Sequence, residues 1–231
     1  MSKNIGVAFD LEGTIVDVES AHHQAHLQIA KQLGLNLTIP EAILKIKHFI
    51  GGPDDLIMKE ILELSGQSGN LEQIYQEDKK MYKNNLSNTV IKTRDGFLKC
   101  LENFKKNGVA LSIGSLTEKD EAKILIEQAG LDKLIPASNI VYRESVKHLK
   151  PAPDVFFETA KRMDINSTDQ IVFEDSPRGV MAAISAGSKM VVGMPVYNSP
   201  DTRKALLEAG ANYVFESWKD VDVDGIISEL K

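Results

Sequence analysis

Asp10 and Glu12 stand two residues apart in the segment DLEGT, directly after a short apolar run and beside Gly13. Glycine lets the backbone turn sharply at such a point. The two carboxylates can divide the work of a nucleophile from that of a general acid and base. Asp10 could attack a phosphorus atom, while Glu12 protonates the leaving oxygen and later deprotonates water. A solvated loop is the alternative, because short acidic motifs recur by chance.

Ser115 and Lys150 supply two residue types that phosphoryl transfer to a carboxylate still needs. Ser115 follows the apolar run 109–114, and its hydroxyl and backbone N–H could donate to a phosphoryl oxygen; capping the next helix is its alternative role. Lys150 precedes Pro151 and offers a cation that would neutralise phosphoryl charge and keep Asp10 ionised. The alternative for Lys150 is an ordinary surface lysine.

Glu174 and Asp175 directly follow the apolar run 171–173. Two acids at the end of a buried strand are poorly placed unless a cation lies nearby. Magnesium prefers hard oxygen ligands and is often bound by one or two carboxylates together with phosphate oxygens. We therefore expect Mg²⁺ to be held between Asp10 and this acidic pair.

The elements that must position these residues alternate between strand and helix. An apolar run at 5–9 predicts the first strand. Further strands are expected at 109–114, 140–141, 171–174 and 189–192, with helices at 96–106, 118–130, 154–162 and 179–186, a helix and strand within 202–215, and a last helix at 223–230. This order predicts an α/β core with a parallel sheet covered on both faces. Ligands of such sheets bind beyond the carboxyl ends of the strands.

One block interrupts the alternation after the first strand. Helical patterns at 18–35, 43–49, 56–64 and 71–86 carry no convincing strand. We therefore expect an α-helical cap domain at 17–87, inserted into a catalytic core of 1–16 and 88–231, where it could act as a lid. The loop at Gly51 and Gly52 is the expected substrate contact in the cap, and His22 and His23 are assigned no catalytic role.

Composition limits the partners. The 231 residues carry a formal net charge of −6, which argues against nucleic-acid binding because the chain lacks a clustered excess of Lys and Arg. No stretch reaches the ~18 apolar residues of a membrane span, and the single cysteine cannot form an internal disulfide. We expect a cytoplasmic protein, either a monomer or a homodimer.

The motifs together resemble the haloacid dehalogenase superfamily, in its helical-cap subgroup with β-phosphoglucomutase and phosphoglycolate phosphatase. The likeness lies in DLEGT at 10–14, Ser115, KPAPDVF at 150–156 and EDSPRGVMAA at 174–183. It implies a Rossmann-like core, Asp10 as nucleophile, and Ser115 and Leu116 in phosphate binding. The Mg²⁺ ligands it implies are Asp10, Asp175 and the backbone carbonyl of Glu12, with Glu174 near the water shell of the ion.

Glu12 departs from the pattern, since most members carry aspartate there, although the enolase-phosphatases of methionine salvage have a similar glutamate. Mutase activity is disfavoured because no arginine follows Gly51, as it does in β-phosphoglucomutases. We expect a magnesium-dependent phosphatase that hydrolyses a small phosphorylated metabolite, a sugar or short-acid phosphate monoester, through an aspartyl-phosphate on Asp10. The alternatives are a catalytically weakened binding or regulatory protein on this fold and a phosphoglucomutase-like phosphotransferase.

Overall fold

The computed structural model describes residues 5–88 and 90–229, which form two compact units. The core unit comprises Met1–Asp17 and Ile91–Lys231, and the helical unit comprises Val18–Val90. The expected domains met at 16/17 and 87/88, so the units of the structure meet one and three residues further along the chain.

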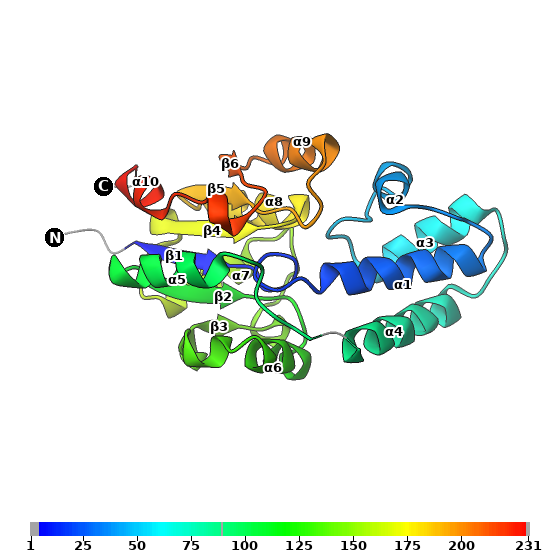
Figure 1. Cartoon of the computed structure of the whole chain (residues 1–231), viewed down its shortest axis with the longest axis horizontal. Helices are drawn as coiled ribbons and strands as arrows, with labels where there is room; N and C mark the ends of the chain where they lie inside the picture. Colours follow the sequence, from blue (N-terminus) through cyan, green and yellow to red (C-terminus); the bar gives the residue numbers. More distant parts are fainter. Residues whose placement is uncertain (1–4, 89, 230–231) are drawn as a thin grey trace. The chain divides into compact units, whose positions relative to one another are not determined.

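The core unit is built on one six-stranded parallel sheet (Figure 1). Its strands are β1 (Gly6–Phe9), β2 (Ala110–Gly114), β3 (Ile140–Val141), β4 (Gln170–Glu174), β5 (Met190–Gly193) and β6 (Tyr213–Val214). They lie in the order β3-β2-β1-β4-β5-β6, with Phe9 in register with Ile113 on one side and Phe173 on the other. The predicted α/β class with a parallel sheet is confirmed. The strand order reverses between β1 and β4, which is where ligands of open α/β sheets bind.

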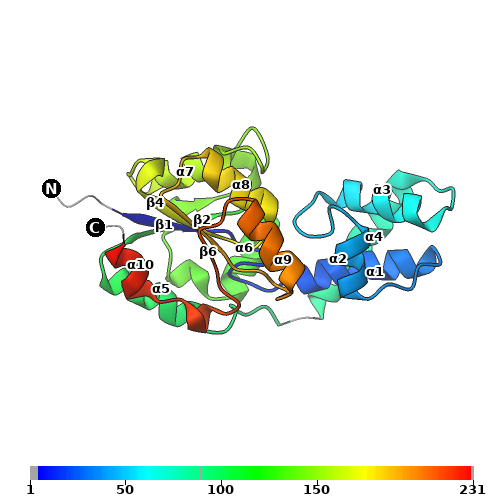
Figure 2. The same cartoon turned by 90° about the horizontal axis from the view of Figure 1, so that it is seen from above.

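Helices cover both faces of this sheet. The α-helices of the core unit are α5 (Phe97–Lys106), α6 (Lys119–Gln128), α7 (Asp154–Arg162), α8 (Pro177–Ser185), α9 (Pro200–Glu208) and α10 (Val223–Ser228). Short 3₁₀ helices are η1 (Leu131–Lys133), η2 (Ala137–Asn139), η3 (Arg143–Ser145), η4 (Ser167–Asp169) and η5 (Trp218–Asp220). Figure 2 shows α7 and α8 on one face and α5 and α10 on the other. Within the described ranges, no helix has both the length and the apolar character needed to cross a membrane.

Aromatic side chains fill the face of the sheet under α5. Phe9 of β1 packs edge-on against Phe97, with ring centroids 5.3 Å apart, and Phe173 of β4 lies 4.9 Å from the ring of Trp218. Burying each such ring contributes a few kcal/mol, roughly 1.5–3. The indole N–H of Trp218 donates to the carbonyl of Thr14 at 3.0 Å. The aromatic cluster therefore also anchors the loop that follows β1.

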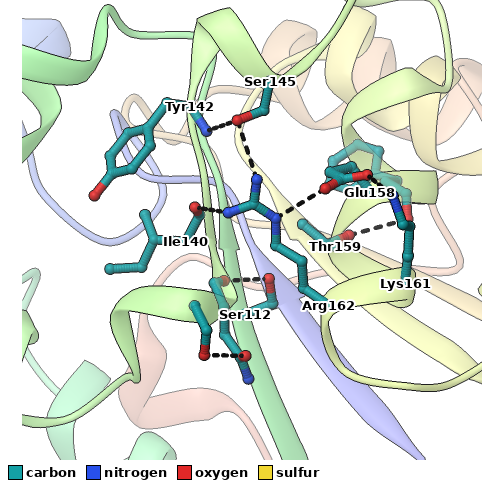
Figure 3. A network of polar contacts seen from close by, with 11 residues as sticks. Ser112, Ile140, Tyr142, Ser145, Glu158, Thr159, Lys161 and Arg162 are labelled. Carbon is teal, nitrogen blue, oxygen red and sulfur yellow. Dashed lines mark hydrogen bonds and ion pairs between the residues drawn. The ribbon is translucent and has the colours of Figure 1, made fainter.

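The short strand β3 is held by side-chain hydrogen bonds as well as by its ladder (Figure 3). The Arg162 guanidinium of α7 donates to the carbonyl of Ile140, to the Ser145 hydroxyl at 3.1 Å and to Glu158 at 3.0 Å. Ser112 of β2 donates to the Asn139 carbonyl at 2.5 Å. These contacts fix the end of β3 beside the end of β2.

The helical unit contains no strand among its described residues. Its helices are α1 (Glu19–Gln32), α2 (Ile39–Lys45), α3 (Asp54–Ser65) and α4 (Leu71–Ser87). They enclose an apolar cluster that includes Ile29, Phe49, Met58 and Ile61.

Some element boundaries differ from those predicted. The helix expected at 43–49 is wrong: α2 begins earlier, because Thr38 and Glu41 form a capping box and Pro40 occupies the first turn. Helix α8 begins at Pro177 rather than 179, since the Ser176 side chain caps it by accepting from the Gly179 N–H. The last helix was expected to reach 230, but α10 ends at Ser228 and residue 230 lies outside the described residues.

Candidate active site

Asp10 lies at the carboxyl end of β1, in the middle of the sheet. Its side chain is buried, with a residue exposure of 7%. Its backbone N–H donates to the carbonyl of Phe173 at 3.0 Å, which ties it to the neighbouring end of β4. This hydrogen bond holds the first motif against the strand that carries the acidic pair.

The loop after Asp10 is a tight turn fixed by backbone hydrogen bonds. Gly13 has a φ of 77°, which side chains rarely tolerate, and its N–H donates to the Val16 carbonyl at 2.8 Å. The Arg94 guanidinium donates to the Gly13 carbonyl at 2.6 Å. Glu12, half-buried, sits in this turn. The backbone that presents its carboxylate is thus fixed on both sides.

Lys150 joins the first motif to the acidic motif. Its ammonium donates to Asp10 Oδ1 at 2.5 Å and also to Glu174 Oε1, and its side chain is only 10% exposed. Arg178 donates to the carbonyl of Lys150 at 2.5 Å, and the Lys150–Pro151 peptide bond is cis. The structure therefore brings together three residues that the sequence placed up to 164 positions apart.

Glu174 is fixed on all sides at the end of β4. It is 1% exposed, and its Oε2 accepts from the Ser176 N–H at 3.1 Å and from the Ser176 hydroxyl at 3.2 Å. A Cβ atom placed on Gly179 would lie 1.9 Å from this carboxylate. Any larger residue at that position would displace the Glu174 carboxylate. Asp175, the next residue, is 6% exposed.

The electrostatics of the site follow from its burial. Burial raises the pKa of Asp10 to about 7; Lys150 opposes this rise, and the Glu174 carboxylate adds to it. Burial alone would lower the pKa of Lys150, but the two carboxylates outweigh it and raise that pKa well above its usual range. Lys150 is therefore a permanent cation at the site.

The donor set suits a hard divalent cation. Asp10, Glu174 and Asp175 each offer a carboxylate oxygen, and these three oxygens all lie within 4.8 Å of one another. The Lys150 ammonium pairs with two of these carboxylates, Asp10 and Glu174. All-oxygen ligands of this kind are what Mg²⁺ prefers. Glu12 was expected to contribute only its backbone carbonyl, and that role stays a prediction.

Ser115 follows β2 as expected, but one of its two proposed donors is occupied. Its N–H donates to the Val141 carbonyl of β3 at 3.0 Å, so the expectation that this amide binds phosphate is wrong. The Ser115 hydroxyl, in a residue 1% exposed, donates to Thr117 Oγ1 at 2.9 Å and accepts from the Thr117 N–H at 3.1 Å. The hydroxyl and the Leu116 segment remain predicted phosphate contacts.

Gly51 and Gly52 lie in the helical unit, between α2 and α3. Gly51 has a φ of 66°, and the Gly52 N–H donates to the His48 carbonyl at 3.0 Å. A Cβ on Gly52 would lie 2.3 Å from that carbonyl oxygen. Both glycines are thus required by a tight turn. Their contact with substrate stays a prediction.

Comparison with known proteins decides the family. Residues 7–192, most of the chain, match the model of the haloacid dehalogenase-like hydrolases. The chain belongs to this family.

Two relatives of this haloacid dehalogenase-like hydrolase are named as phosphatases. It is 30% identical over 207 residues to the phosphorylated carbohydrates phosphatase of Thermotoga maritima, covering 89% of this chain and 91% of that protein. It is also 30% identical over 188 residues to the fructose-1-phosphate phosphatase YqaB of Escherichia coli, covering 80% and 94%. The prediction of an enzyme, a phosphoric monoester hydrolase, is confirmed.

Solved structures of the haloacid dehalogenase-like family share the fold. A conserved haloacid dehalogenase-like protein from Agrobacterium tumefaciens superposes with a TM-score of 0.85 at 20% identity, covering 98% of this chain and 99% of that one. A family hydrolase from Deinococcus radiodurans, solved with bound phosphate and sodium, gives 0.79 at 23% identity, covering 100% and 98%. The predicted haloacid dehalogenase-like fold is confirmed.

Several residues that support the hydrolase site escaped the sequence analysis. Arg94 bears no local signal, because its three carbonyl partners come from distant loops. Ser176 and Gly179 did carry one: Ser-Pro at 176–177 is a typical helix start, which would have placed the Gly179 N–H at the capping hydroxyl.

Proposed function

We propose that this chain is a magnesium-dependent phosphatase that hydrolyses the phosphate monoester of a small sugar through an aspartyl-phosphate on Asp10. The contact that supports it most is the Lys150 ammonium, which bridges Asp10 and Glu174 beside Asp175. A nucleophilic carboxylate, a fixed cation and an acidic cation site then share one buried location. The sugar is suggested by the names of the two phosphatase relatives.

The chemistry is a double displacement. A carboxylate oxygen of Asp10 attacks the phosphorus atom, the bond between phosphorus and the sugar oxygen breaks, and Glu12 gives its proton to the leaving oxygen. Glu12 then takes a proton from water, which attacks the aspartyl-phosphate, releases inorganic phosphate and restores Asp10.

Lys150 orients the nucleophile for these steps. Because Lys150 holds Oδ1 of Asp10, the carboxylate cannot rotate freely. The ammonium also lies where it can neutralise phosphoryl charge. Mg²⁺, held by Asp10 and Asp175 with Glu174 beside it, would screen the repulsion between the nucleophile and the phosphoryl group.

The decisive experiment replaces the nucleophile. Phosphate release is measured with phosphorylated sugars, polyols, nucleotides and short acids, with Mg²⁺ present and again after chelation. Asp10→Asn should lower kcat by about 10³-fold or more, and chelation should abolish turnover reversibly. Asp132→Asn, an exposed aspartate in η1, is the matched control and should leave kcat unchanged.

The covalent intermediate can be located directly. Rapid quenching during turnover followed by borohydride reduction converts an acyl phosphate to homoserine, and peptide mass spectrometry should find it at residue 10. Normal turnover by Asp10→Asn, or homoserine at another aspartate, would overturn the mechanism. Conversion of one sugar phosphate into another without release of phosphate would favour the phosphotransferase instead.

A further inference from the structure

His22 and His26 form a second cluster of ligand atoms, within the helical unit. They stand four residues apart on α1, so they share one face of the helix. Asp54, the first residue of α3, completes the group: one ring nitrogen from each histidine and one oxygen of Asp54 all lie within 4.8 Å of one another. Helices α1 and α3, together with α4, pack against one another (Figure 1).

His26 is oriented by a buried carboxylate. Its Nδ1 lies 2.9 Å from Asp78 Oδ1, and both side chains are at most 2% exposed. Its Nε2 points toward Asp54, with 3.7 Å between Nε2 and Asp54 Oδ1. A histidine that bonds a carboxylate through one nitrogen and offers the other to a metal is the usual arrangement around protein-bound zinc. Asp78, on α4, therefore stands in the supporting position.

His22 supplies the second imidazole of the cluster. Across the part of the chain that the structure describes, its buried Nδ1 has no hydrogen-bond partner. Its ring stacks on Tyr82, with centroids 3.5 Å apart, which fixes the plane of the imidazole. Burial, followed by the neighbouring His26, lowers the pKa of His22 well below its usual value. The neutral imidazole, which is the form that binds metals, therefore predominates at neutral pH.

We propose that His22, His26 and Asp54 form a binding site for a borderline divalent cation such as Zn²⁺ or Co²⁺ in the helical unit, with Asp78 as the supporting carboxylate. Two imidazoles and one carboxylate are a zinc-type set, whereas Mg²⁺ takes oxygen ligands. Ligands of a tetrahedral zinc lie about 3.3 Å apart. The 3.7 Å between His26 Nε2 and Asp54 Oδ1 is already close to this value, and His22 must move to complete the set. The fourth position is left to water or a ligand.

Charge balance supports a cation at this position. Burial raises the pKa of Asp54, the His26 charge opposes that rise, and Asp78 adds to it. Lys79 of α4 adds a positive charge near Asp54, and Glu19 of α1 adds a carboxylate near His26. The arrangement that competes with a metal is a protonated His26 held between Asp78 and Asp54. These two states differ in proton number, because metal binding must displace the proton from His26.

The experiment titrates the metal-free whole protein with Co²⁺ in excess Mg²⁺, which occupies oxygen-only sites. The wild type should bind one Co²⁺ with the intense visible absorption of a four-coordinate, nitrogen-bearing site, and Zn²⁺ should displace it. Calorimetry in buffers of different ionisation enthalpy should detect proton release on binding. Asp175→Asn, in the core unit, should leave this absorption unchanged.

Three variants test the ligand set. His22→Phe keeps a ring stacked on Tyr82 but removes both nitrogens, and Asp54→Asn changes a partly exposed side chain; each should weaken Co²⁺ binding about 100-fold or more. Asp78→Asn should weaken it roughly 10- to 100-fold. His48→Gln is the control, since His48 pairs with Glu60 at 2.6 Å, and its affinity should equal that of the wild type.

Two results would overturn the proposal. One is a wild type without saturable Co²⁺ absorption, which would leave the protonated His26 pair as the explanation of the cluster. The other is equal affinity in His22→Phe, Asp54→Asn and His48→Gln. Circular dichroism identifies any variant that fails to fold, and Asp54→Asn then gives the same readout without disturbing the buried stack.

Discussion

Lys150 is a buried cation whose two carboxylate partners come from distant parts of the chain. A buried ammonium between two carboxylates is costly to desolvate and is stable only when every partner is in place. That Asp10 and Asp175 lie close together could be predicted, because β1 and β4 are neighbouring parallel strands whose carboxyl ends meet at one edge of the sheet. Lys150 lies in the loop after β3, and only its motif pointed to this location. The atoms that these residues use could not be predicted, since those depend on the packing around each side chain.

Gly179 packs directly against the Glu174 carboxylate, which a side chain at this position would displace. Adding a methyl group in Gly179→Ala would place Cβ against the Glu174 carboxylate, which Ser176 and Lys150 hold from the other sides. We expect kcat to fall at least tenfold, equivalent to about 1.4 kcal/mol, because Glu174 must move away from Lys150. Steady-state kinetics and thermal melting measure the two effects.

Met181→Ala is the matched control for Gly179→Ala, because Met181 lies on the same helix and is 46% exposed. It should leave kcat unchanged. An alanine at 179 with wild-type kcat would show that Glu174 tolerates displacement and that its hydrogen bonds to Ser176 are not needed for turnover.

At the scale of elements, Arg94 joins two segments that no local pattern connects. Its guanidinium donates to the carbonyls of Gly13 and Met194 at 2.6 Å and of Pro195 at 2.8 Å. The loop after β1 is thereby tied to the segment after β5. The sequence did not predict this link, because the carbonyl partners of Arg94 lie 81 to 101 residues away and its local pattern is that of any surface arginine. Only the order of the strands brings these partners together.

Replacing Arg94 should therefore affect both stability and rate. Arg94→Met leaves three carbonyls without their donor, and we expect a loss of about 2–4 kcal/mol in the free energy of unfolding. We also expect kcat to fall more than KM rises, because the turn that carries Glu12 loosens. Urea unfolding and steady-state kinetics check both parts.

Arg203→Met serves for comparison, since Arg203 also donates to a backbone carbonyl, that of Val214 at 2.8 Å, but through one bond. It should cost less stability and leave kcat unchanged. Equal effects of the two substitutions would mean that Arg94 is an ordinary structural arginine.

Helix α1 of the helical unit carries a histidine that should make this unit acid-sensitive. His23 is 2% exposed, its Nε2 lies 3.1 Å from the Phe49 carbonyl, and its ring stacks on Phe49. Burial lowers the pKa of His23 from 6.5 to about 3, and the charge of His26 adds to this effect. Below pH 6.5, His23 therefore becomes protonated in the unfolded chain, whereas in the folded unit it stays neutral down to about pH 3.

The contribution of His23 to the stability of the helical unit should thus be complete above pH 6.5 and be lost as the pH drops toward 3, at up to about 1.4 kcal/mol per pH unit. Hydrogen exchange of the α1 and α4 amides would measure it. His23→Gln, which keeps a donor for the Phe49 carbonyl but does not titrate, should flatten the slope. His148→Gln, in the core unit, should not; an unchanged slope in His23→Gln would refute the prediction.

The boundaries of helix α2 differ from the predicted ones because of its capping residues. Apolar spacing alone favoured 43–49, but Thr38, Pro40 and Glu41 together begin α2 at Ile39. End signals act through specific hydrogen bonds and therefore outweigh periodicity over so short a helix. Long amphipathic segments such as α4 could be predicted to within a residue, because many apolar positions define them.

At the scale of the whole molecule, the core unit is completed by chain segments from both sides of the inserted helices. Strand β1 precedes the insertion, and its neighbours β2 and β4 follow it. The two ends of the insertion are joined within the core unit itself: Val16 forms an antiparallel bridge with Thr93, and the Arg94 N–H donates to the Ile15 carbonyl at 2.7 Å. The core unit should therefore close without the inserted residues.

Replacing residues 18–90 by a short Gly-Ser linker between Asp17 and Ile91 should leave a folded core. Its sheet, its aromatic cluster and the contacts of Lys150 with Asp10 and Glu174 all lie within one unit, so none of them depends on the removed helices. We expect a cooperative unfolding transition and residual, chelator-sensitive hydrolysis of a small aryl phosphate, with discrimination among sugar phosphates reduced. Far-UV circular dichroism and the substrate panel measure these outcomes. Asp10→Asn in the shortened chain is the control for residual activity, and a shortened chain that fails to fold would show that the core unit depends on the helical unit for its stability.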